Sequence, residues 1–182
     1  METLNIDKEK AINAYQQGSE EQKKVLEKVF GVETFKPKTI KDRIKTFDDA
    51  LKELGPNHIL VKEYNVIHNN MTTLSMKYYL RLCVITAALN EGWRPKFVEG
   101  EKRYFPYFRL YSSEEIRQMS KEEKSSVVYQ SCDYASGGVS LAFTICDTTT
   151  VRFGSRLAFK TSELAEYAGK QFGKLYANYL GI

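Results

Sequence analysis

The chain reads TTLSMKYYLRLCVITAALNEGWRPKFVEGEKRYFPYFRLY from Thr72 to Tyr111, and this stretch decides the expected fold. No proline or glycine occurs between residues 72 and 91. Large side chains recur there at intervals of three and four residues: Leu74, Tyr78, Leu82, Ile85 and Leu89. Such spacing predicts an α-helix. Tyr79, Cys83 and Thr86 widen the stripe, so we expect the helix to be buried along much of its length.

The helix should end near Gly92, because glycine suits the left-handed position just past a helix and Pro95 prevents continuation. Trp93, the only tryptophan, lies between them. We expect its ring to pack on the core, and stacking on a ligand is the alternative.

A strand is expected from Arg103 to Tyr111, since aromatic residues dominate this segment. Side chains alternate between the two faces of a strand. One face then suits a core, with Tyr104, Pro106, Phe108 and Leu110. The other face carries aromatic rings between guanidinium groups: Arg103, Phe105, Tyr107, Arg109 and Tyr111. Pro106 cannot donate a ladder hydrogen bond, so the strand is expected at a sheet edge or at a bulge.

Composition is that of an ordinary globular chain. Of its 182 residues, 42% are hydrophobic and 27% are charged, and the net charge is +4, which requires no nucleic-acid partner. Three widely spaced cysteines, at positions 83, 132 and 146, predict neither a disulfide framework nor a zinc site. The first residues lack the pattern of a signal peptide, and no apolar run is long enough to span a membrane. We expect a cytoplasmic protein without a membrane partner.

Helix caps and stops divide the first part of the chain. Asp7, Ser19 and Thr39 are expected to begin three helices, which Gly18, Gly31 and Gly55 would end. We therefore expect an N-terminal helical segment at 1–55 and an α+β domain at 56–182, which together form one compact unit.

Three further strands are expected in the second half, at 127–134, 139–147 and 151–160, the first two forming a hairpin. The strands follow one another too closely for helical crossovers, which disfavours a parallel sheet. The predicted fold class is α+β: an antiparallel sheet of about four strands, packed by the central helix and a C-terminal helix. That last helix should begin at Thr161 or Ser162.

Small residues one turn apart form a stripe on the last helix: Ala165, Gly169, Gly173 and Ala177. Two glycines in a helix cost about 1 kcal/mol each relative to alanine, and close approach of a neighbouring backbone would offset this cost. A homo-oligomer contact through the same four residues is the alternative.

Motifs that carry catalysis are missing from the sequence. It has no glycine-rich phosphate loop, serine nucleophile elbow or zinc-binding histidine helix. His58 and His68 have no neighbours at metal-ligand spacing, and Asp133 and Asp147 are interpreted as solvated strand ends. We expect no enzyme activity, no catalytic residue, no metal and no cofactor.

Four segments resemble those of a family of small uncharacterised proteins encoded by phages and prophages of gut anaerobic bacteria. They are TFDDA at 46–50, ALNEGWRP at 88–95, RYFPYF at 103–108 and GSRLAFKTSELAEYAGKQF at 154–172. The resemblance covers roughly residues 39 to 180, and that family has tryptophan where this chain has Tyr107. It implies a bacterial host cell or a virion-associated location. The family has no assigned activity, so the resemblance transfers no catalytic residue.

The first functional hypothesis is binding of DNA or RNA by a phage-type accessory protein. Aromatic rings stack on bases, and Arg or Lys contacts phosphates. The candidate residues lie on the strands expected at 103–111 and 151–160: Arg103, Phe105, Tyr107, Arg109, Tyr111, Arg152, Arg156 and Lys160.

The alternative is a protein-interaction module that binds a phage or host protein, either as a structural component or as an inhibitor. Aromatic residues and arginine are enriched in binding hot spots. The two hypotheses predict different surfaces. A nucleic-acid binder keeps Arg109, Arg152 and Arg156 on one continuous positive face, whereas an interaction module exposes apolar area and pairs those arginines with carboxylates.

Overall fold

The computed structural model describes residues 6–36, 38–69, 73–96, 98–132, 135–148 and 155–181. The chain forms two compact units, Met1–Thr39 and Ile40–Ile182. The division does not lie at residue 55, and the expectation of one compact unit is wrong. Residues 40–55 belong to the second unit because Ile40, Ile44 and Ala50 are buried in its core.

The first unit contains α1 (Lys8–Gln17), α2 (Glu20–Phe30) and the 3-10 helix η1 (Val32–Thr34). Its caps are the predicted ones. Asp7 accepts a hydrogen bond from the N–H of Glu9, and Ser19 forms a capping box with Gln22. Stacked rings of Tyr15 and Phe35, 4.3 Å apart, hold the end of the unit against α1.

The second unit begins with four helices, α3 (Ile40–Arg43), α4 (Phe47–Leu54), α5 (Ile59–Asn69) and α6 (Leu74–Leu89). The single helix expected from Thr39 is split, because Thr46 forms a new capping box with Asp49. The central helix is confirmed as α6, with Leu82 and Leu89 fully buried, whereas Leu74 at its start is exposed. Gly92 has the expected positive φ of 85°.

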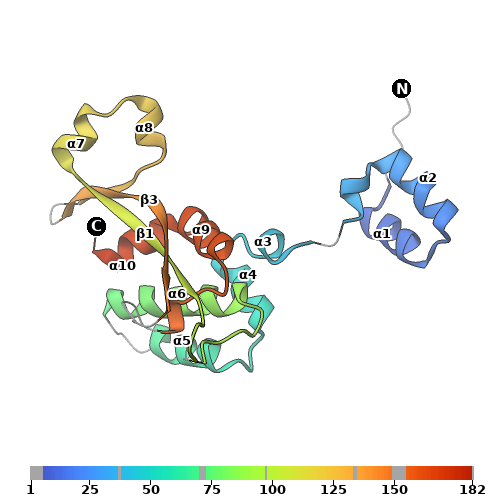
Figure 1. The fold of residues 1–182 in the computed structure, drawn as a ribbon, viewed down its shortest axis with the longest axis horizontal. Coiled ribbons are helices and arrows are strands. Elements are labelled where there is room, and N and C mark those ends of the chain that lie inside the picture. The colour runs from blue at the N-terminus through green and yellow to red at the C-terminus, as the bar shows by residue number, and fades with distance from the viewer. Residues whose placement is uncertain are drawn as a thin grey trace. The chain divides into compact units, whose positions relative to one another are not determined.

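Among the described residues the sheet has three strands, β1 (Arg103–Ser112), β2 (Val128–Cys132) and β3 (Ala135–Asp147), in the antiparallel order β1-β3-β2. The helices α7 (Ser113–Gln118) and α8 (Lys121–Ser125) connect β1 to β2 (Figure 1). The hairpin is confirmed, but β3 begins at Ala135, which pairs with Cys132, so residues 135–138 belong to the strand.

The prediction of a strand at 151–160 is wrong for residues 155–160. Residues 151–154 lie outside the described residues. Residues 155–157 form the 3-10 helix η2 (Ser155–Leu157), and only Phe159 bridges to a strand, at Tyr104. The physical reason is an alternative set of partners: backbone groups of Ala158 and Lys160 hydrogen-bond to the side chain of Asn90 instead of to a strand.

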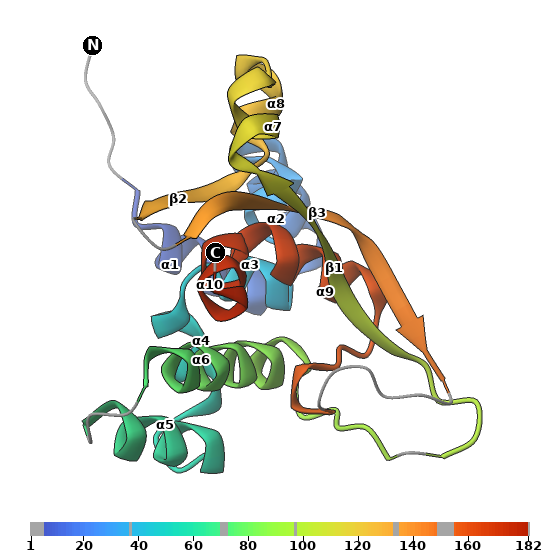
Figure 2. The same cartoon turned by 90° about the vertical axis from the view of Figure 1, so that its left-hand side faces the viewer.

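The last helix is divided at Phe172 into α9 (Ser162–Gln171) and α10 (Gly173–Leu180), which lie on one face of the sheet (Figure 2). The small residues are buried there. A Cβ on Gly169 would lie 2.6 Å from Leu141 and 3.0 Å from Pro106, and one on Gly173 would lie 3.3 Å from Val128. Close packing on the sheet is therefore the role of the stripe. An oligomer through Ala165, Gly169, Gly173 and Ala177 is not supported, because the unit itself covers this face.

Replacing Gly169 with leucine should destabilise the monomer by about 1–3 kcal/mol, because the new side chain must displace Pro106 and Leu141. Chemical denaturation monitored by circular dichroism measures the loss. Gly173→Ala is the matched control and should change stability much less, since its Cβ meets only one side-chain atom. Equal stability of Gly169→Leu and the wild type would contradict the packing role.

Candidate functional site

The start of β1 is buried, contrary to the prediction of an open Arg-aromatic face. Arg103 is 3% exposed and Phe105 is 2% exposed. The cause is the segment 158–160. Tyr104 exchanges two backbone hydrogen bonds with Phe159, at 3.0 and 2.8 Å, and Phe159 and Phe105 join the same core. Arg103 is therefore not accessible for binding, and Phe105 contributes chiefly to the core.

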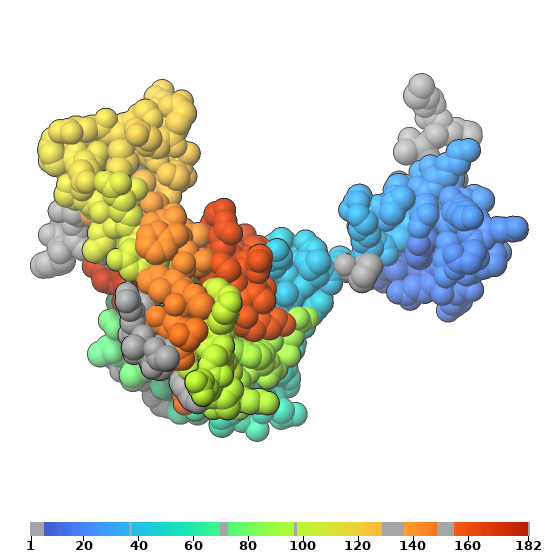
Figure 3. Space-filling model, in the orientation of Figure 1, coloured from blue at the N-terminus to red at the C-terminus, as the bar shows by residue number. Residues whose placement is uncertain are grey.

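The other half of β1 stays at the surface. The rings of Tyr107 and Phe143, its partner on β3, stack 4.7 Å apart, and both side chains are exposed. Farther along, the Arg109 guanidinium lies 4.7 Å from the centre of the Tyr111 ring. Arg109 also lies 3.6 Å from a Glu115 carboxylate oxygen, with both side chains largely exposed. Figure 3 shows β1 and β3, in yellow-green and orange, reaching the surface on this side of the unit.

The remaining candidates do not join this surface. Arg156 is paired with Glu63 on α5 at 2.9 Å, and Lys160 is paired with Glu91 beyond α6 at 3.0 Å. Arg152 lies outside the described residues. The described candidates therefore form no continuous positive face, because each accessible cation has a carboxylate partner from another element.

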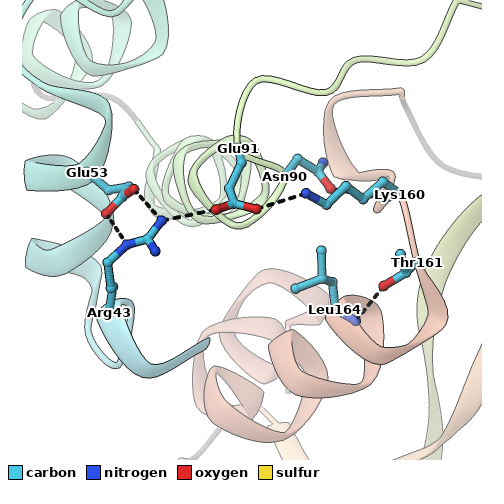
Figure 4. A network of polar contacts seen from close by, with 7 residues as sticks. All are labelled: Arg43, Glu53, Asn90, Glu91, Lys160, Thr161 and Leu164. Carbon is cyan, nitrogen blue, oxygen red and sulfur yellow. Dashed lines mark hydrogen bonds and ion pairs between the residues drawn. The ribbon is translucent and has the colours of Figure 1, made fainter. Parts of the chain in front are cut away.

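Glu91 is the centre of the ion-pair network drawn in Figure 4. One of its oxygens lies 3.1 Å from Arg43, which also binds Glu53 at 2.9 Å, and the other lies 3.0 Å from Lys160. Hydrogen bonds from Lys160 and Arg43 lower the pKa of Glu91. The network connects α3, α4, the end of α6 and the segment before α9.

Asn90, next to Glu91, is buried and uses both ends of its amide. Its Nδ2 donates to the Ala158 carbonyl at 2.8 Å, and its Oδ1 accepts from the Lys160 N–H at 3.0 Å. These bonds place Phe159 between them against Tyr104. Asn90 therefore positions the residue that covers the start of β1.

Beyond that point the outer edge of β1 is open. Tyr104 directs its backbone groups away from β3, toward Phe159, so every second residue of the strand does the same. β1 keeps this alternation past the bulge, because the extra residue is Ala142 on β3. Ser112 fits the same alternation, since its N–H points away from β3 and donates to the Glu115 side chain. In the described part of the chain, the outward backbone groups of Phe108 and Leu110 have no partner.

An apolar groove adjoins this edge, with a volume of about 180 Å³. We call it the edge groove. It is lined by residues of β1, η2 and α10: Phe105, Pro106, Tyr107, Phe108, Leu110, Leu157, Tyr176, Tyr179 and Leu180. Leu110 is 62% exposed at its mouth, and the Phe108 and Tyr176 rings pack 4.9 Å apart in its wall. The groove is smaller than the roughly 300–1,000 Å³ of typical small-molecule sites.

A second cavity, of about 270 Å³, lies where α5, the end of α6 and η2 meet. Trp93, Arg94 and the Arg156–Glu63 pair are part of its lining. Trp93 is partly buried and packs against the core, which confirms the packing interpretation for that residue. The polar groups of Asn90 and Arg156 in this cavity are already engaged, so the cavity is a weaker candidate than the edge groove.

Reactive chemistry has little support among the described residues. They contain no group of three or more His, Cys, Asp or Glu side chains that could hold a metal ion. Burial raises the pKa of the Cys83 thiol to about 11, so the thiol is neutral near pH 7 and is a poor nucleophile. Asp147 is buried rather than solvated, and Asp133 lies outside the described residues. No helix in the described ranges is long and apolar enough to cross a membrane.

No protein-family model, curated protein or solved structure matches this chain, so its function is argued from its own geometry. Sequence reasoning found the edge strand, through Pro106, the exposed residues Tyr107 and Arg109, and the half-buried Tyr111. It missed the edge groove, because Leu157, Tyr176 and Leu180 come from segments whose positions only the fold determines.

Replacing Asn90 with alanine should lower the free energy of unfolding by about 1–3 kcal/mol, because buried backbone groups of Ala158 and Lys160 lose their partner. Urea denaturation measures the change. Asn65→Ala, at an exposed position on α5, is the control and should stay within about 0.5 kcal/mol of the wild type. An equally small effect at Asn90 would show that the segment 158–160 is held by other contacts.

The network at Glu91 should make stability depend on pH. Its folded-state pKa lies below the ordinary value of 4.5, so its contribution is complete above pH 4.5 and is lost as the pH falls through the lowered pKa. The urea midpoint of the wild type should therefore fall more steeply below pH 4.5 than that of Glu91→Gln. Parallel pH profiles for the two proteins would contradict this role.

Proposed function

We propose that the protein is a protein-interaction module that binds its partner through the exposed half of β1 and the edge groove. The observation that carries the proposal is an open strand edge beside an apolar groove, at the end of β1 that the described residues of the unit leave uncovered. Unpaired strand edges are templates for pairing with another chain, and folded proteins ordinarily protect them.

Apolar exposure supports the same function. Tyr107, Leu110, Phe143 and Leu180 all present large exposed side chains on or beside β1. Aromatic residues and arginine dominate the energetics of protein interfaces, and Tyr107, Arg109 and Tyr111 supply both kinds. A partner of this kind accords with the expectation of a phage or host protein as the target.

Nucleic-acid binding is the weaker proposal because the basic residues are dispersed and paired. Arg109, Arg156 and Lys160 each contact a glutamate, and Arg103 is buried. Non-specific binding to nucleic acid depends on several cations that contact successive phosphates. The described part of the chain does not place these residues on one surface.

Selection from a display library of random short peptides tests the proposal, with the full-length chain as bait. Selected peptides should bind the wild type and lose affinity roughly tenfold or more for Leu110→Lys, which places a charge at the mouth of the groove. Leu74→Lys is the matched control, since Leu74 is equally exposed but lies at the start of α6. It should bind like the wild type.

Two results would overturn the proposal. One is a selection that yields no peptide whose binding depends on Leu110. The other is salt-dependent binding of single- or double-stranded DNA or RNA, measured by fluorescence anisotropy, that weakens in Arg109→Ala, because this would assign the same surface to nucleic acid.

A further inference from the structure

We infer that the partner binds as an extended peptide that adds a strand to the outer edge of β1, with a sequence that alternates apolar, acidic and apolar residues. This inference rests on the proposed function and specifies the chemistry of the partner. It follows from three features of the same site: the backbone groups of the edge, the groove beside it and the charge on the strand.

The backbone of the edge requires an extended occupant. Phe108 and Leu110 each present an outward N–H and C=O, and these four groups have the spacing of a β ladder. Phe159 already occupies the neighbouring-strand position at Tyr104, and among the described residues no other residue of β1 has such a partner on this side. A peptide would continue this neighbouring strand along β1, from Pro106 toward Ser112. A helical partner cannot satisfy these groups, because its own backbone groups are paired internally.

The groove selects apolar side chains at alternate positions. Peptide residues opposite Phe108 and Leu110 share the face of those two residues, since cross-strand neighbours lie on the same side of a sheet. That face leads to Tyr176, Tyr179 and Leu180 on α10. The volume of about 180 Å³ suits individual side chains better than a whole small molecule.

The charge on the strand selects an acidic residue between the two apolar ones. The peptide residue opposite Arg109 lies on the other face, beside a guanidinium whose own pairing with Glu115 is exposed and 3.6 Å long. The wider unit is also positive. The first 39 residues carry seven basic and seven acidic side chains, so the net charge of +4 belongs to residues 40–182. An acidic segment is therefore attracted to this unit.

A second copy of the chain fits the edge less well. In a symmetric antiparallel pair of two β1 strands, the two-fold axis must pass beside Phe108, Arg109 or Leu110, and that residue then faces its own copy. Centring on Phe108 places Leu110 opposite Pro106, which has no N–H. Centring on Arg109 places like charges opposite one another, which destabilises a sheet. Centring on Leu110 requires the N–H of Ser112, which already donates to Glu115. A separate peptide avoids all three costs.

The experiment uses synthetic versions of the Leu110-dependent peptides from the display library. A series with one N-methylated amide per peptide tests strand addition. Methylation should reduce affinity roughly tenfold at every second position and have little effect at the positions between, because alternate amides face β1. Amide hydrogen exchange of Phe108 and Leu110, followed by NMR, should slow when the peptide binds.

A substitution of Arg109 tests whether the strand selects an acidic peptide residue. Selection against Arg109→Glu should replace the acidic residue of the consensus sequence with lysine or arginine, while the flanking apolar residues remain. Three results would overturn strand addition and leave the proposed function intact. The Leu110-dependent peptides could bind as helices, the methylated series could show no alternation, or the amides of Phe108 and Leu110 could stay unprotected. Concentration-dependent dimers abolished by Leu110→Lys would instead assign the edge to a second copy.

Discussion

The two hydrogen bonds of the Asn90 side chain hold the segment 158–160 against the end of α6, and this segment covers the start of β1. They join the end of the buried helix α6 to the backbone on either side of Phe159. Phe159 then pairs with Tyr104 at the start of β1. A buried amide tolerates no loss of either bond, because an unpaired buried polar group is costly. The link from the end of α6 through Phe159 to β1 thus relies on one side chain.

The same constraint explains why only half of β1 is open. Where Phe159 lies beside the strand, Arg103 and Phe105 are buried. Where the segment turns away into α9, no described residue lies beside the edge of β1 as a strand, and α10 supplies the far wall of the groove. The open half of β1 follows from the segment 158–160, which bridges to β1 at Phe159 and does not continue as a strand in its described part.

The sequence motifs that looked most specific have structural roles. In the Asn-Glu-Gly-Trp segment, Asn90 holds the segment 158–160 and Glu91 joins Arg43 to Lys160. Gly92 adopts a positive φ, and Trp93 packs on the core. In the tail, Gly169 makes room for the sheet. These residues are required by the fold, so they do not mark the site. The resemblance to phage and prophage proteins stays a prediction.

The sequence alone determined the central helix, the edge strand, the hairpin and the caps, because periodicity, Pro106 and capping residues act over a few neighbouring positions. It also supplied Tyr107, Arg109 and Tyr111 as surface residues. Only the tertiary structure decided that Arg156 and Lys160 pair with glutamates far away in the chain, and that Phe105 is buried. The reason is that these contacts join segments separated by tens of residues. Local pattern carries no information about such contacts, which form only when the packed core brings distant segments together.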